Sequence, residues 1–372
     1  MLVPFAIVLF IGSFAASAVL TALAKRVAPR LGLVAYPKAD RYHRSIIPLG
    51  GGIAIFLTLA LFLIAGAGTM RFLIIPGHFG SLVERAHLNP ADFLHHAGEL
   101  LVILLCATIL FLIGLWDDKH ALGPLIKLVF QFIVAILAAA FADVRVEFFI
   151  ENRVATSILS AFWIVLIVNA FNFLDNMDGA SAGIAAIASS VLLTAAAFNG
   201  QVFVSGLAIA FIGALLGFLI FNFPPASIFM GDAGSLVVGF FVALLTLRTT
   251  YYHQAQSGSW YPVLLPLIAM AVPLYDFTSV TLLRISQGKS PFVGDTQHFS
   301  HRLRRRGLTD TQTTLTLYLA TLCTGLGATF LYQVNLVGAI LIVGQTLLIV
   351  GIIGVFEGTG KADRKEDNND GR

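Results

Sequence analysis

The sequence has little charge and little cysteine. Only 12% of its 372 residues are Asp, Glu, Lys or Arg, whereas soluble domains average about 25%. Both cysteines, Cys106 and Cys323, lie inside apolar runs, so neither a disulfide framework nor a cysteine metal site is indicated. The lysine motif of a P-loop and the glycine fingerprint of a Rossmann fold are also missing. These absences argue against a soluble nucleotide-binding enzyme.

Long apolar runs fill most of the chain instead. Hydrophobic residues make up 58% of it, and a run of roughly 20 can cross a bilayer as a helix. The runs are continuous rather than alternating, which excludes a closed β-barrel. The sequence therefore predicts an all-α polytopic membrane protein with about eleven transmembrane helices, formed by residues 1–356. Residues 357–372 are expected to be a disordered cytoplasmic tail. The predicted spans are 4–23, 48–68, 99–115, 124–142, 158–174, 180–198, 202–222, 235–252, 261–283, 313–332 and 335–356.

The positive charges predict an orientation. Of the 23 Lys and Arg residues, 18 fall on one side of the predicted spans. The positive-inside rule then places the N-terminus outside and the C-terminus in the cytoplasm. Lys25 and Arg26 follow the first apolar run rather than precede it, so this run is expected to stay as a span and not to be cleaved as a signal peptide. The outer loop at 69–98 holds four histidines without the ligand pattern of a zinc site.

Two carboxylates occupy the junction between two of these runs. The stretch Asn169 to Gly183 reads NAFNFLDNMDGASAG, with Asp175 and Asp178 three residues apart. This spacing places both on one face of a helical end. Asn169 and Asn172 repeat the spacing one turn earlier. Ionisable groups at the mouth of a membrane bundle are costly and indicate function by default.

Two further predicted spans have carboxylates at their ends. Asp117 and Asp118 end one span, and adjacent carboxylates repel, so a cation binds them or one keeps its proton. Mg²⁺ suits them because it takes oxygen ligands and shares its remaining positions with phosphates. Gly231 and Asp232 follow a Pro-Pro break, and Asp232 would be a third carboxylate for the same metal. Lys127, at the start of another span, could meet a phosphate as a point charge.

Histidine and arginine concentrate in the last inner loop. His298 and His301 lie three residues apart and precede a basic run. Such a run suits a diphosphate or anionic lipid headgroups, although inner loops are also basic for topological reasons alone. The arginines of this run are Arg302, Arg304, Arg305 and Arg306.

All of these clusters fall on the predicted cytoplasmic side. Transporters usually hold their ionisable site near the bilayer midplane, whereas this layout predicts an active site that faces the cytosol. Carboxylates at three helix ends, together with His and Arg, indicate metal-assisted phosphoryl transfer. The apolar setting indicates that one substrate is a lipid.

The motifs resemble those of the polyprenyl-phosphate N-acetylhexosamine-1-phosphate transferases, the superfamily of glycosyltransferase family 4. The resemblance runs from about Lys38 to Leu308, with the motifs in the same order. The residues that carry it are the pair Asp117-Asp118, Lys127, Asn169 to Gly179, Phe229 to Leu236, Asp295 to Leu303, and His43 with Pro48 to Gly52.

The resemblance implies a reaction and a role for each matched residue. A lipid phosphate would attack the β-phosphorus of a UDP-amino sugar to give a polyprenyl-diphospho-sugar and UMP, with Mg²⁺ as cofactor and Mn²⁺ as its alternative. Asp117 would be the base for the lipid phosphate or would orient it, with Asp118 in support. The implied catalytic residues are Asp117, Asp118, Asp232, His298 and His301, of which Asp232 and Asp117 would hold the metal. The implied substrate-binding residues are Lys127, Asn169, Asn172, Asp175, Asp178, Arg302, Arg304 and His43.

The chain departs from the family pattern at three positions. Asn176 stands between the two acids where glycine is usual, Thr296 where arginine is usual, and Ser300 where a second consecutive histidine is usual. The spans resemble the branch that uses UDP-GlcNAc or a related sugar, at the bacterial inner membrane, to begin synthesis of cell-envelope polysaccharides such as O-antigen or teichoic acid. The expected partners are polyprenyl phosphate and the UDP-amino sugar, without nucleic acid, and a homodimer is left open.

Three other functions compete with this one. The first is the UDP-MurNAc-pentapeptide transferase of peptidoglycan synthesis, although its triple-histidine pattern is absent. The second is a CDP-alcohol phosphotransferase, whose motif requires an arginine after Asp178-Gly179, where Ser181 and Ala182 follow instead. The third, a cation-coupled transporter or lipid flippase, predicts acids at mid-span, and only Asp276 approaches that position.

Overall fold

The computed structural model describes residues 2–36, 46–76, 90–145, 152–251, 260–290 and 298–358. Almost all of these residues are helical, and the only strands among them are β1 (Val34–Ala35) and β2 (Ile47–Pro48), an antiparallel pair. The longer helices are α1 (Leu2–Val27), α2 (Gly51–Thr69), α4 (Pro90–His120), α5 (Pro124–Phe141), α6 (Arg153–Leu174), α7 (Ala180–Phe198), α8 (Val202–Asn222), α9 (Asp232–Arg248), α11 (Ala271–Ser286), α13 (Asp310–Thr329) and α14 (Leu336–Gly358). The shorter helices are η1 (Ala28–Leu31), η2 (Met70–Ile74), η3 (Tyr261–Leu264), α10 (Leu265–Ala269), α12 (Phe299–Arg305) and η4 (Phe330–Tyr332).

Each predicted span coincides with a helix or with a broken pair of helices. Within the described residues, nine helices are long and apolar enough to cross a membrane, and a pair bent by 62° at Met270 raises the number to ten. The chain is therefore a nearly all-α protein with multiple candidate membrane spans. The predicted span at 235–252 corresponds to α9, which is 17 residues long and begins earlier, at Asp232. The count of eleven spans and the orientation remain predictions.

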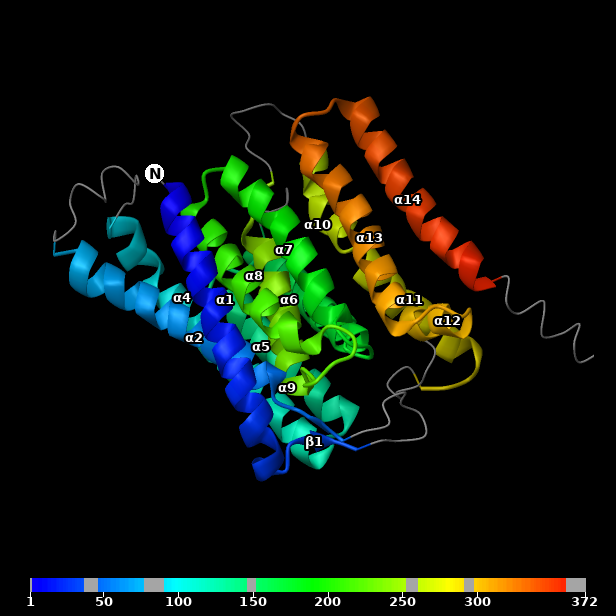
Figure 1. The fold of residues 1–372 in the computed structure, drawn as a ribbon. Coiled ribbons are helices and arrows are strands. Elements are labelled where there is room, and N and C mark those ends of the chain that lie inside the picture. The colour runs from blue at the N-terminus through cyan, green and yellow to red at the C-terminus, as the bar shows by residue number, and fades with distance from the viewer. Residues whose placement is uncertain are drawn as a thin grey trace, which may run out of the picture.

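The helix α9 is the centre of the bundle. Every residue from Ala233 to Thr246 is buried, and α9 packs against α2, α4, α6 and α7 (Figure 1). A helix that is apolar on all sides is stable only when it is covered on all sides. Close approach at its start depends on glycine, because a Cβ on Gly52 would lie 2.2 Å from the Gly234 nitrogen, and a Cβ on Gly114 would lie 2.5 Å from the Ala233 Cα.

The polar segments of the sequence meet at one end of this bundle. Successive helices run in opposite directions, so that α4, α6 and α8 end where α5, α7 and α9 begin, at the lower end in Figure 1. The strand segment joins them there, since the Phe229 amide donates to the Pro48 carbonyl oxygen of β2 at 2.9 Å. The prediction that the polar clusters share one side of the membrane agrees with this arrangement, while the side that faces the cytosol stays a prediction.

The loop predicted at 69–98 is shorter than expected. Its described flanks are helical, because α2 continues to Thr69 and η2 to Ile74, and α4 begins at Pro90. Apolar residues such as Phe72 continue the helix beyond the predicted end at residue 68. Other predictions fall outside the described residues. They are those on His43, on Asp295 and Thr296, and on the tail beyond residue 358.

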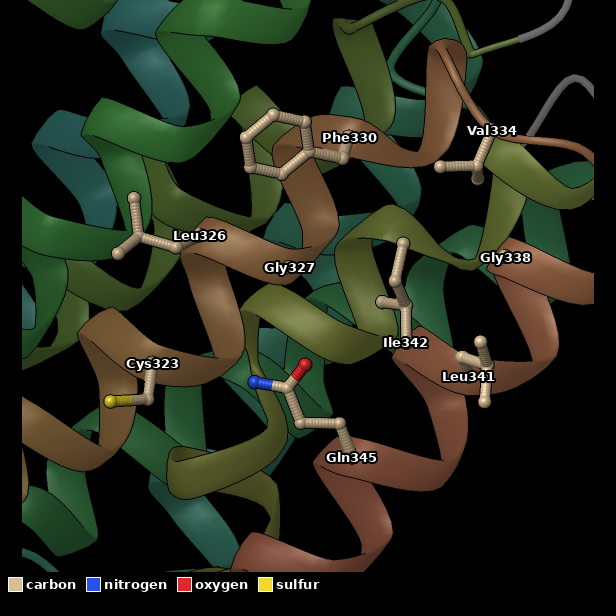
Figure 2. Close-up of a pocket in the computed structure, with 9 residues that line it drawn as sticks. All are labelled: Cys323, Leu326, Gly327, Phe330, Val334, Gly338, Leu341, Ile342 and Gln345. Carbon is tan, nitrogen blue, oxygen red and sulfur yellow. The ribbon is translucent and has the colours of Figure 1, made fainter.

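The helices α13 and α14 form the edge of the bundle. A shallow apolar groove lies between the C-terminal half of α13 and the N-terminal half of α14 (Figure 2). It is lined by Phe330, Leu341 and Ile342 among others. Cys323 and Gln345 also line it. Most of its lining is hydrocarbon, which is the surface that a membrane-spanning helix pair presents to lipid.

Candidate active site

An ammonium group joins two carboxylates at the polar end of the bundle. Lys127 Nζ donates to Asp117 Oδ2 at 2.7 Å and to Asp232 Oδ2 at 2.8 Å. The three side chains are 9–26% exposed, so they are partly screened from water yet open to a ligand. They come from α4, α5 and α9. The two carboxylates, Asp117 and Asp232, are 115 residues apart in the sequence.

Local sequence explains why these three groups converge. Gly123 and Pro124 start α5 directly after α4 ends, which places Lys127 in the first turn of α5. The Leu122 amide donates to Asp117 Oδ1 and fixes that carboxylate against the turn. Gly231 adopts φ 74° and ψ 174°, a conformation that favours glycine, and the chain then turns sharply into α9 with Asp232 as its first residue.

Asp118 caps the start of α9. Its Oδ1 accepts from the Asp232 amide at 2.7 Å and its Oδ2 from the Ala233 amide at 3.1 Å. The amides that follow this glycine turn point at an anion, and that anion is a side chain of the protein itself. A helix N-terminus stabilises negative charge in this way. Asp118 therefore positions Asp232, and it is Asp117, not Asp118, that shares Lys127 with Asp232.

Asn172 holds the other side of Asp232. Its amide nitrogen donates to Asp232 Oδ1 and to Ser235 Oγ, both at 2.8 Å. Asn169, one turn earlier, donates instead to Gln131 Oε1 at 2.6 Å and to the Val165 carbonyl oxygen at 2.8 Å. Thus the structure brings Asn172 into the carboxylate cluster, whereas Asn169 ties α6 to α5.

The second acidic pair belongs to the turn between α6 and α7. Asp175 forms the C-cap of α6. Asp178 Oδ2 accepts from the Ala226 amide at 2.8 Å, which connects this turn to the loop before α9. The Gly179 amide donates to Asn222 Oδ1 at 3.0 Å, and its φ of 73° favours glycine. The predicted helical face shared by the two acids is therefore a turn, because α6 ends at Leu174 and helical geometry resumes only at Ala180. Their substrate contacts stay a prediction.

The donor set around Lys127 fits a magnesium ion. Among the described residues, no group of three His, Cys, Asp or Glu side chains could hold a metal alone. Mg²⁺ in phosphate-processing sites needs less, since it usually takes one or two carboxylates and completes its shell with waters and substrate phosphates. Asp117 and Asp232 offer two carboxylates already drawn together by one cation. Asp118, the other member of the adjacent acidic pair, accepts the two α9 amides.

The histidine segment packs against the end of α6 and against α11 through α12. His298 is the N-cap of α12, and its ring lies edge-on to Phe173 of α6, with 5.4 Å between the ring centroids. His301 lies one turn further and is 6% exposed. The Arg302 guanidinium donates to Ser279 Oγ at 2.7 Å. Arg304 pairs with Asp310 at 3.0 Å, and both side chains are at least 30% exposed.

A hydrogen bond joins α12 to the acidic turn. Ser300 Oγ donates to Asn176 Oδ1 at 2.5 Å. The Asn176 amide nitrogen donates to the Phe173 carbonyl oxygen, so both ends of this side chain are held. Ser300 and Asn176, two of the three positions that depart from the family pattern, thus contact each other. The sequence alone does not predict this contact.

We predict that a substrate binds where α12 meets the acidic turn and that this bond supports its binding. Ser300→Ala and Asn176→Ala should each raise the KM for that substrate about fivefold, the effect of roughly 1 kcal/mol from one hydrogen bond. The double variant should be no worse than either single variant, because both remove the same bond. Steady-state kinetics on all four proteins measures this. Ser286→Ala, which removes a hydroxyl bonded only within α11, is the control, and fully additive losses would contradict the coupling.

The pKa of the His301 imidazole is lowered from 6.5 to about 4, first by burial and then electrostatically by the neighbouring His298 and Arg305. Arg304 lowers it further and Asp276 opposes the shift. His301 is therefore neutral at physiological pH, as suits a hydrogen-bonding contact to a nucleotide or phosphate.

This pKa shift predicts a pH-dependent stability. Below pH 6.5 the unfolded chain gains a proton at His301 that the folded protein does not take up until about pH 4. Stability should therefore fall as pH is lowered from 6.5 to 4, by up to about 3 kcal/mol. Thermal unfolding in detergent at pH 7.5 and pH 5 measures the change, and His301→Gln should flatten it. An equally steep fall in His301→Gln would show that another group is responsible.

Several residues of the site were not anticipated as such. Asn222 clamps the acidic turn, and its amide nitrogen also donates to the Ile228 carbonyl oxygen at 3.0 Å. Asp276, 1% exposed, contacts His298. The sequence feature that could have identified Asn222 and Asp276 is a polar side chain within an apolar run, since such a group must find partners when it is buried.

Known proteins match this chain over the same region. The model of glycosyl transferase family 4 matches residues 100–250, which contain Asp117, Lys127, Asn172 and Asp232. This match, together with the relatives that follow, confirms the resemblance that the motifs predicted.

Individual relatives extend the match to 84–96% of the chain. A probable undecaprenyl-phosphate N-acetylglucosaminyl 1-phosphate transferase from Bacillus subtilis is 29% identical over 367 residues, 96% of this chain and 93% of its own. An undecaprenyl-phosphate α-N-acetylglucosaminyl 1-phosphate transferase from Salmonella typhi is 29% identical over 84% of this chain and 80% of its own. A decaprenyl-phosphate N-acetylglucosaminephosphotransferase from Mycobacterium tuberculosis is 27% identical over 87% of this chain and 84% of its own.

Proposed function

We propose that this protein transfers N-acetylglucosamine 1-phosphate from UDP-N-acetylglucosamine to a polyprenyl phosphate, with release of UMP and with Mg²⁺ as cofactor. The observation that carries the proposal is the cluster in which Lys127 bridges Asp117 and Asp232 at the polar end of an apolar bundle. The relatives named for this transfer align over 84–96% of the chain, and their names supply the proposed lipid phosphate and the proposed N-acetylglucosamine 1-phosphate. The UDP donor is the one that the motif resemblance implies. The proposed location is the bacterial inner membrane, with this end of the bundle toward the cytosol.

The geometry suits phosphoryl transfer because that reaction depends mainly on positioning and on neutralising charge. Bound Mg²⁺ would supply charge neutralisation on the diphosphate, held by Asp117 and Asp232. Lys127 is placed to contact a phosphate oxygen as a point charge. A bound phosphate would then compete with the two carboxylates for the hydrogen bonds of the Lys127 ammonium. Asn172 and Asp118 keep Asp232 in one orientation. Asp117 orients the lipid phosphate, and its action as a base is a hypothesis, since a phosphate monoester with a second pKa of about 6 is already largely ionised.

The test is UMP release by the purified protein in detergent. We expect UMP only when polyprenyl phosphate, UDP-N-acetylglucosamine and Mg²⁺ are all present, and mass spectrometry should find the polyprenyl-diphospho-sugar. Chelation by EDTA should abolish release, and added Mg²⁺ or Mn²⁺ should restore it. Release that persists without the lipid would indicate hydrolysis rather than transfer.

Parallel assays with other UDP-sugars distinguish the alternatives. UDP-MurNAc-pentapeptide as the preferred donor would place the protein in peptidoglycan synthesis. No UMP with any donor, from folded protein, would favour a transporter or flippase. The structure offers less to that reading, because the carboxylate cluster lies at the helix ends and not at mid-span.

A further inference from the structure

We infer that Asp276 is a positioning residue that fixes the tautomer and direction of His298, in a pair that acts as one unit. The inference rests on the proposed function for its effect on rate, but its structural content is independent of that function. Neither residue belongs to the Lys127 cluster, and Asp276 lies on α11, a different element from the α12 segment that it contacts.

Both oxygens of Asp276 are used by the start of α12. Asp276 Oδ2 lies 3.1 Å from His298 Nδ1, and Asp276 Oδ1 accepts from the Phe299 amide at 2.7 Å. The Asp276 side chain is 1% exposed and that of His298 is 7% exposed. A buried carboxylate needs such partners to offset the loss of its hydration, so the pair is held in one arrangement.

The chemistry of the two groups decides which nitrogen carries the proton. An ionised carboxylate only accepts hydrogen bonds, so Nδ1 must be the donor. In the neutral imidazole, Nε2 is then left with its lone pair as a hydrogen-bond acceptor. An acceptor at this position complements a hydroxyl or amide N–H of a sugar donor. It does not complement a phosphate oxygen, which is itself an acceptor.

The surrounding rings restrict His298 further. Phe173 meets the His298 ring edge-on. The Arg284 guanidinium in turn lies over the Phe173 ring, 5.0 Å from its centroid. Phe277, the residue after Asp276, packs on Phe173 with 5.0 Å between the ring centroids. The carboxylate therefore sets the tautomer, while the aromatic contacts set the plane of the ring.

Asp276→Asn separates orientation from folding. Asparagine is as good a helix N-cap acceptor as aspartate, so its Oδ1 can still accept from the Phe299 amide. Its Nδ2 can only donate, which requires an unprotonated Nδ1 and moves the imidazole proton to Nε2. We expect kcat/KM for the sugar donor to fall about 10- to 100-fold, as when groups that orient a functional histidine are removed, with little change in Tm.

The double variant tests whether the two residues act together. Asp276→Asn combined with His298→Gln should be no slower than His298→Gln alone, because the carboxylate acts through the histidine. Thr309→Ala is the structural comparison, since it removes the capping box of the adjacent helix α13 without contact to His298. It should lower Tm while kcat/KM is unchanged. Losses of kcat/KM that add in the double variant would overturn the inference. So would a loss of kcat/KM in Asp276→Asn that is no larger than the loss in Thr309→Ala.

A spectroscopic measurement makes the test independent of activity. The ¹⁵N shifts of the labelled imidazoles distinguish the two neutral tautomers, and subtraction of the His298→Gln spectrum assigns His298. We expect the Nδ1–H tautomer in the wild-type protein and the Nε2–H tautomer in Asp276→Asn. An Nε2–H tautomer in the wild-type protein would refute the inference even if UMP is released. If no UMP is released but the tautomers are as expected, the proposed function fails and the pairing stands.

Discussion

Asp232→Asn is expected to lower the rate of UMP release by about 10³-fold while the protein stays folded. Loss of one group that stabilises charge in a transition state typically costs 10²–10³-fold, and Asp232 also contributes to the metal site in our proposal. An asparagine at position 232 keeps an oxygen that can accept from the Asn172 amide. Its own amide nitrogen would face the Lys127 ammonium, and no hydrogen bond can form there because both groups are donors. The variant therefore removes charge and breaks the Lys127 bridge at nearly constant volume.

Asp143→Asn is the matched control for this variant. Asp143 pairs with Arg145 just after α5, at the opposite end of that helix from Lys127, and its φ of 49° is one that asparagine tolerates. The control should retain wild-type kinetics. Thermal shift with Mg²⁺ gives a second readout, because Asp232→Asn should lose the stabilisation that Mg²⁺ provides. A rate in Asp232→Asn within tenfold of the wild type would remove Asp232 from the catalytic machinery.

Lys127→Met is expected to reduce kcat by about 10²–10³-fold, again the effect of one lost charge-stabilising group. Methionine preserves much of the length of the side chain but removes the cation shared by Asp117 and Asp232. The two carboxylates then repel each other, and a divalent cation becomes the remaining means of neutralising them. Mg²⁺ should consequently raise the Tm of Lys127→Met by more than it raises that of the wild type.

Lys119→Met provides the comparison, because Lys119 is an exposed lysine at the same end of α4. It should leave kcat and the Mg²⁺ response unchanged. If Lys127→Met shows a smaller Mg²⁺ response than the wild type, the two carboxylates do not hold the metal. In that case Lys127 organises the site in some other way.

The sequence was sufficient to predict most of the long helices because they are continuous apolar runs of about the length that a bilayer requires. The break at Met270 and the short helix α12 were not predicted. It also predicted that the polar segments gather at one end of the bundle, since the polar interruptions of those runs are where α4, α6 and α8 end and where α5, α7 and α9 begin. The boundary of α9 was less accurate. Asp232 is polar, so it was assigned to the preceding loop, although Asp118 makes it the first helical residue.

The assignment of individual partners could not be predicted. Asp118 follows Asp117 directly, yet one contacts Lys127 and the other the α9 amides. Nothing in the local sequence distinguishes them, because the difference comes from how α4 packs against α9. The same holds for Ser300 and Asn176, which are 124 residues apart. Such contacts depend on helix packing, which hydrophobic periodicity alone does not determine.

The close glycine contacts at the start of α9 limit how this protein can be engineered. Replacing helical glycines with alanine is a common way to raise stability. At Gly52 and Gly114 the added methyl group would meet the backbone of α9 at 2.2–2.5 Å and displace Asp232 from Lys127. Gly344 and Gly351 of α14 face open space instead. A search for thermostable variants for inhibitor screening should therefore begin on α14 and leave the small residues beneath the carboxylates unchanged.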